Sequence, residues 1–163
     1  MKVVYNVDLS ESGINELQRG LKEYQKFIWR KSDELCKRLA DMGAVKASLY
    51  FSRSVYTGKE DHEISVRRIE GGYAVRADGE TVLFVEFGTG LIGYGHPEAH
   101  GLGPGTYPGK GHWDDPEGWW LPRNKSDGHS QHTFGNPPNA PMYNTVKELE
   151  QELARVVKEV FAL

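Results

Sequence analysis

The chain lacks the features that define several large classes of protein. One cysteine, Cys36, among 163 residues excludes an internal disulfide and a zinc site built from several thiolates. Acidic residues outnumber basic ones by 23 to 20, so there is no cationic surplus of the kind that binds nucleic acid non-specifically. No apolar run approaches the roughly 20 residues that span a bilayer, and residues 1–8 lack the apolar core of a signal peptide. We therefore expect a single intracellular domain with no membrane segment.

Two segments carry the periodicity of amphipathic helices. Residues 12–41 form the first, with Ser10 and Ser12 offering N-cap hydroxyls and Gly43 predicting the stop. The second begins at Pro141 and runs to the C-terminus. The apolar residues that recur at steps of three or four are Ile14, Leu17, Leu21, Tyr24, Phe27, Ile28, Leu35, Leu39 and Met42 in the first helix, and Met142, Val146, Leu149, Leu153, Val156 and Val160 in the second.

The region between the helices is rich in strand signals. Residues 1–8, 47–51 and 62–69 predict strands, and Val55 and Tyr56 extend the second of these. The Glu70-Gly71-Gly72 turn predicts a hairpin into residues 73–77. The apolar run 81–87 predicts a buried strand, with a short helix as the alternative. The expected fold class is therefore α+β, with a long N-terminal helix and a C-terminal helix packed on an antiparallel meander of four or five strands.

A long loop divides the chain into residues 1–87, 88–139 and 140–163 of one domain. Twelve of the 19 glycines lie between Gly88 and Gly135, and all eight prolines lie between Pro97 and Pro141. Such a stretch has no helical or strand periodicity, and it predicts an extended irregular loop. Its aromatic content argues against full disorder.

Three kinds of chemistry compete for this loop. Its histidines (His96, His100, His112, His129 and His132) offer a metal-dependent hydrolase, but Pro97 breaks the helix that a zinc-binding histidine pair needs. Its tryptophans (Trp113, Trp119 and Trp120) offer a stacking platform for carbohydrate. The same tryptophans fit a protein interface or an anchor for the loop, and we favour that interpretation.

A series of short motifs resembles one known family. Phe84-Val85-Glu86-Phe87-Gly88-Thr89-Gly90 is followed by Gly118-Trp119-Trp120, then by Thr133-Phe134-Gly135, and lastly by Ala140-Pro141-Met142-Tyr143-Asn144-Thr145. In order and placement these motifs resemble the head–tail joining and tail-completion proteins of long-tailed bacteriophages and prophages, also called minor tail components of the neck. Met42-Gly43-Ala44 stands where many members have Asp-Thr-Gly, and Pro-Met-Tyr replaces a motif that usually contains phenylalanine.

The resemblance implies a structural virion protein without catalytic activity and without a cofactor. Relatives form rings, commonly hexameric, between the head connector and the tail tube, so the expected partners are further copies of this chain and those neck and tail proteins. DNA would pass the ring without sequence-specific binding, and the protein would be made in the host cytoplasm and end in the virion. The motif residues would then serve fold and assembly, with Trp113, Trp119 and Trp120 as interface candidates.

Overall fold

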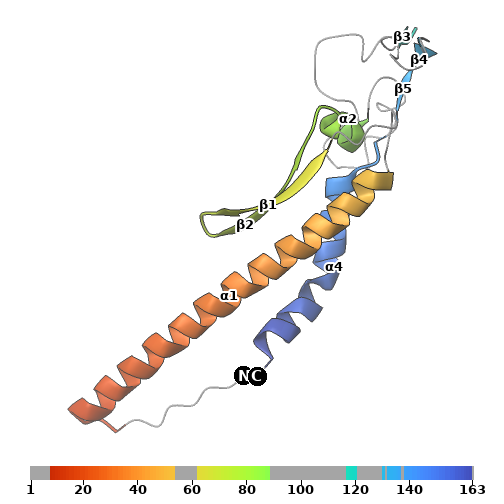
Figure 1. The fold of residues 1–163 in the computed structure, drawn as a ribbon. Helices are drawn as coiled ribbons and strands as arrows, with labels where there is room; N and C mark the ends of the chain where they lie inside the picture. Colours follow the sequence, from red (N-terminus) through yellow and green to blue (C-terminus); the bar gives the residue numbers. More distant parts are fainter. Residues whose placement is uncertain are drawn as a thin grey trace.

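The computed structural model describes residues 8–53, 62–88, 117–120, 130, 132–136 and 138–162. Two long helices and an antiparallel hairpin dominate it, so the mixed α+β class is confirmed (Figure 1). In chain order the elements are α1 (Glu11–Arg53), β1 (Glu63–Ile69), β2 (Gly72–Asp78), α2 (Val82–Phe87), β3 (Trp119–Trp120), β4 (His132–Thr133), β5 (Gly135–Asn136) and α4 (Pro141–Phe161).

Helix α1 begins as predicted and continues far past its predicted end. The Gly13 amide donates to Ser10 Oγ at 3.1 Å, which is the expected N-cap. The predicted stop at Gly43 is wrong, and residues 47–51 are the last turns of the helix instead of a strand. A Cβ built at Gly43 would lie 3.1 Å from Leu149 Cδ1 and 3.2 Å from Val75 Cγ2. Gly43 therefore lets α4 and β2 approach α1 closely, and it does not end the helix.

The hairpin follows the prediction, whereas the segment after it does not. Strands β1 and β2 pair antiparallel around Val66 and Val75, with Gly71 at a φ of 80° in the turn. Residues 82–87 form helix α2, so the predicted strand is wrong and its helical alternative is correct. Val82, Val85 and Glu86 are buried, a spacing that fits one side of a helix.

The predicted meander of four or five strands is also wrong for the part of the chain that the structure describes. The hairpin stands as a two-stranded sheet, and β3 and β4 form a second, short antiparallel pair. Two segments that were predicted as strands, residues 47–51 and 81–87, are helical instead, and this accounts for most of the missing strands. The expected strand at residues 1–8 falls almost wholly outside the described residues, as do Val55 and Tyr56.

Helix α4 starts at Pro141 as predicted and lies antiparallel to the second half of α1. Val156 and Val160 are fully buried on α4, and each contributes roughly 1.5–3 kcal/mol by leaving water. A second cluster joins the end of α1 to α2 and to the start of α4, and it consists of Phe51, Val82 and Val85 with Ile64, Ala77 and Met142 packed against them.

Candidate functional site

The side chain of Glu86 joins two segments that the sequence analysis singled out separately. Its carboxylate accepts hydrogen bonds from the backbone amides of Met142, at 2.8 Å, and Tyr143, at 3.0 Å. Glu86 is 8% exposed, so these two bonds form away from bulk water. The Glu86–Phe87–Gly88 end of α2 and the Pro141–Met142 start of α4 are thereby held together, 56 residues apart along the chain.

The carboxylate supplies what the start of α4 lacks. Ala140 occupies the N-cap position with a φ of 51° and offers no side-chain acceptor, and Pro141 has no amide hydrogen. The next two amides would be unsatisfied, and Glu86 accepts from both. A negative charge here also complements the positive end of the helix dipole. In a second link between the segments, the Asn139 amide donates to the Val85 carbonyl at 2.9 Å.

The other motif residues divide between this junction and a separate small ribbon. Gly88 takes a φ of 74° at the end of α2, where its amide donates to the Phe84 carbonyl at 3.0 Å. Thr133 is buried in β4, and its Oγ1 accepts from the Gly135 amide at 3.0 Å. Thr89 and Gly90 lie outside the described residues.

The β3–β4 ribbon presents aromatic side chains to solvent. Trp120 is 66% exposed and Phe134 is 46% exposed. The His132 ring lies between them, with 5.0 Å between ring centroids on each side and edge-on geometry in both pairs. Trp119 is half-buried, and Trp113 lies outside the described residues. The three rings meet edge to face and so do not share one plane.

Of the five loop histidines, the structure describes His132 alone. Within the described ranges no three His, Cys, Asp or Glu side chains are grouped closely enough to hold a metal ion. His62 stacks on Phe51 at 5.0 Å in the core region. The same ranges contain no helix long and apolar enough to cross a bilayer.

A group of polar and charged side chains joins α1 to α4. Lys46 and Tyr50 on α1 both donate to the Glu148 carboxylate on α4. The Lys46 ammonium and the Tyr50 hydroxyl hold the pKa of Glu148 below its ordinary value of 4.5. The hydrogen bond to the same carboxylate raises the pKa of Lys46 above 10.5 and that of Tyr50 above 10.0.

The first half of α1 projects beyond the rest of the described chain (Figure 1). Arg38 pairs with Glu159 near the end of α4, so α4 ends alongside the middle of α1. No residue of α1 before Ala40 is buried. We refer to residues 11–28 as the arm, which is about 27 Å long at 1.5 Å per residue. Sequence periodicity predicts a covered face along the whole helix, and the part of the chain that the structure describes leaves this half of it uncovered.

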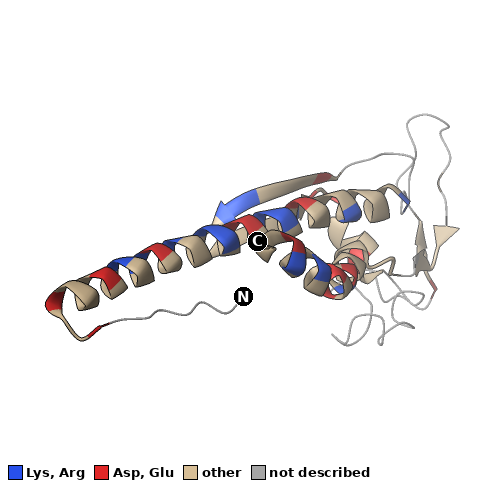
Figure 2. Ribbon diagram, turned by 90° about the horizontal axis from the view of Figure 1, so that it is seen from below, with Lys and Arg blue, Asp and Glu red and all other residues tan. Residues whose placement is uncertain are grey.

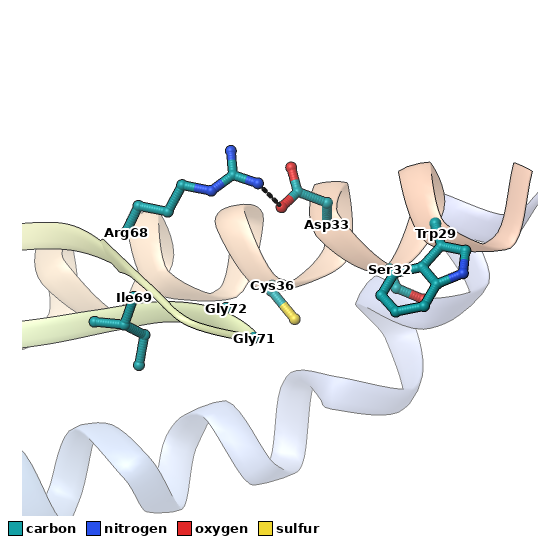
Figure 3. Close-up of a pocket in the computed structure, with 8 residues that line it drawn as sticks. All are labelled: Trp29, Ser32, Asp33, Cys36, Arg68, Ile69, Gly71 and Gly72. Atoms are coloured by element: carbon teal, nitrogen blue, oxygen red, sulfur yellow. Dashed lines mark hydrogen bonds and ion pairs between the residues drawn. The ribbon is translucent and has the colours of Figure 1, made fainter. Parts of the chain in front are cut away.

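A hollow of about 410 Å³ lies between α1 and the tip of the hairpin (Figure 3). Arg68 on the hairpin reaches Asp33 on α1 with a 3.1 Å ion pair at its edge. Trp29 and Ile69 are exposed beside it. No sequence pattern pointed to this hollow, because it forms only where the hairpin tip meets the helix. Its lining residues are Trp29, Ser32, Asp33, Cys36, Arg68, Ile69, Gly71 and Gly72.

Comparison with protein-family models, with curated proteins and with solved structures finds no match to this chain. The fold and the site define a mixed α+β protein in which the Glu86 carboxylate caps helix α4 and the first part of α1 projects as a helical arm. The Glu86 contacts hold α2 to α4, and apolar side chains are exposed on the arm and near the β3–β4 ribbon.

Proposed function

We propose that this chain is a structural subunit of the head–tail junction of a long-tailed bacteriophage or prophage, where it assembles into a ring that completes or connects the tail. The proposal starts from the ordered motifs of residues 84–90, 118–120, 133–135 and 140–145. The observation that carries it is the Glu86 junction. Residues from the first and the last of these motifs meet in one hydrogen-bonded unit, with the glutamate of one motif capping the helix opened by the other.

Two exposed apolar features support an assembly role. Leu21 on the arm is 48% exposed, and Trp120 on the β3–β4 ribbon is 66% exposed. Each has exposed apolar neighbours, Ile14 and Tyr24 on the arm and Phe134 near the ribbon, and exposed apolar side chains grouped in this way are typical of surfaces that another protein covers. They stand on different parts of the molecule, so the chain offers two separate surfaces for contact with other subunits.

The proposed partners are further copies of this chain, the head-connector proteins and the tail tube, and the proposed location is the neck of the virion. No cofactor is proposed. Acidic and basic side chains alternate over the helices (Figure 2), a pattern that suits contact with proteins better than tight binding to DNA.

The test is deletion of the gene in the phage or prophage that carries it, followed by electron microscopy of the lysate. We expect DNA-filled heads and free tails that do not join, and rescue by the wild-type chain from a plasmid. Mass spectrometry of purified wild-type virions should detect the chain in a fixed ratio to the tail-tube protein. Normal, infective particles without the chain would refute the proposal.

A further inference from the structure

We propose that the arm pairs with the arm of a second copy of this chain, helix against helix, through the apolar seam of Ile14, Leu17, Leu21, Tyr24 and Ile28. The inference concerns how copies contact one another and so rests in part on the proposed function. The contact itself is argued from the arm alone.

The seam lies on the face of α1 that helix α4 covers in the second half of α1. Seven-residue steps from Ile14 lead through Leu21 and Ile28 to Met42, on the side of α1 that carries Lys46, the partner of Glu148 on α4. Helix α4 ends at Phe161, before it reaches the arm. Among the described residues, one continuous apolar face is therefore covered by a helix in the second half of α1 and left uncovered in the first half.

The arm gains no tertiary packing from the described chain comparable to that of the second half of α1, where all the buried residues of the helix lie. Each internal glycine also weakens a helix by roughly 1 kcal/mol relative to alanine, so a covering partner would stabilise the arm. The arm has 18 residues and contains Gly13 and Gly20. Ile14 is 44% exposed, Leu21 48% and Tyr24 37%, whereas Leu17 and Ile28 are half-buried, so the described chain leaves three of the five seam side chains exposed.

The shape of the seam identifies a helix as its occupant. Its members follow one another at steps of three, four, three and four residues. This narrow stripe is typical of a helix–helix seam, whereas a helix that packs on a broad core carries a wider apolar face.

The flanks of the seam identify the partner as an identical arm. The positions that border it are Glu11, Gly13, Gln18, Gly20, Gln25 and Phe27, and Glu11 at the N-terminal end is the charged one among them. From Leu17 to Ile28 two copies can pair without placing like charges opposite each other, and Gly20 permits close approach. Gly13 is already covered by Asp8, so close approach does not extend to it. The other charged residues of the arm lie away from the seam and are mixed in sign, with Glu16 and Glu23 against Arg19, Lys22 and Lys26, as the alternating red and blue of α1 in Figure 2 illustrates. This mixture does not fit an anionic membrane surface.

Sedimentation of the full chain from low to several hundred micromolar tests the pairing, with circular dichroism to verify the fold. We expect concentration-dependent association of the wild type, weakened about 30-fold or more by Leu21→Glu, which places a charge in the seam. Asn15→Glu is the matched control, because it introduces the same charge on the same helix away from the seam. It should associate like the wild type.

A disulfide assay gives a second measurement that does not depend on destabilising the arm. In a Cys36→Ser background, Leu21→Cys should form a disulfide between copies on oxidation, and Asn15→Cys should not. A wild type that stays monomeric over the whole range, or association that Leu21→Glu leaves unchanged, would overturn the pairing. The proposed function fails separately, if virions assemble normally without the chain.

Discussion

Replacing Glu86 by alanine tests the junction that links α2 to α4. The substitution removes both acceptors for the Met142 and Tyr143 amides, and Ala140 has no side chain that can replace them. Hydrogen bonds that involve a charged group contribute about 1.5–3 kcal/mol each, so we expect a loss of about 3 kcal/mol at the lower end. For a chain of this size that corresponds to a fall in Tm of roughly 6–12 °C.

Two further variants separate the cap from a general effect of losing a carboxylate. Glu86→Gln keeps one acceptor oxygen but loses the charge and turns an amide donor toward the other N–H, so its Tm should fall between those of wild type and Glu86→Ala. Glu150→Ala makes the same chemical change on the exposed side of α4, where the carboxylate only pairs with Lys147, and should lower Tm by less than about 2 °C.

Thermal unfolding followed by circular dichroism gives the global values, and amide hydrogen exchange gives the local one. The Met142 and Tyr143 amides should exchange faster in Glu86→Ala than in the control. If Glu86→Ala melts with the control and those amides keep their protection, the carboxylate does not hold the start of α4 and the reasoning is wrong.

Three more predictions follow from other contacts. Gly43→Val should destabilise the chain by about 1–3 kcal/mol in urea unfolding, because its side chain would overpack the α1–α4–β2 crossing; an unchanged midpoint would contradict that packing. The lowered pKa of Glu148 stabilises the fold above pH 4.5 and that contribution is lost as pH falls through the folded value, whereas the raised pKa values of Lys46 and Tyr50 stabilise it below about pH 10 and are lost above. The free energies of unfolding of wild type and Glu148→Gln, measured over a pH series, should therefore converge at low and at high pH. A difference between the two proteins that stays constant with pH would count against the contact. Trp120→Ala should leave Tm nearly unchanged, since the side chain is 66% exposed, while it weakens ring assembly measured by mass photometry; a large drop in Tm with intact assembly would assign this tryptophan to the core.

The candidate site was only partly accessible from the sequence. Glu86 and Met142 stood out as motif residues, but nothing in their spacing indicated that one caps the helix containing the other. A helix cap is usually read from residues next to the helix start, and here the acceptor lies 56 residues away. The hollow beside Trp29 was missed for the same reason, because two elements distant in sequence build it.

The sequence determined those features of the fold that depend on residues close together in the chain. The Ser10 cap, the hairpin turn at Gly71 and the start of α4 at Pro141 were predictable, because caps, turns and helical periodicity act within a few residues. Tertiary packing decided the rest. Gly43 looked like a helix stop and became a close contact with α4, and the apolar run before Gly88 became a helix because one side of it is buried against α1 and α4. The sequence also specified the apolar face of α1, but the length and position of α4 decide which half of that face a helix of the described chain covers.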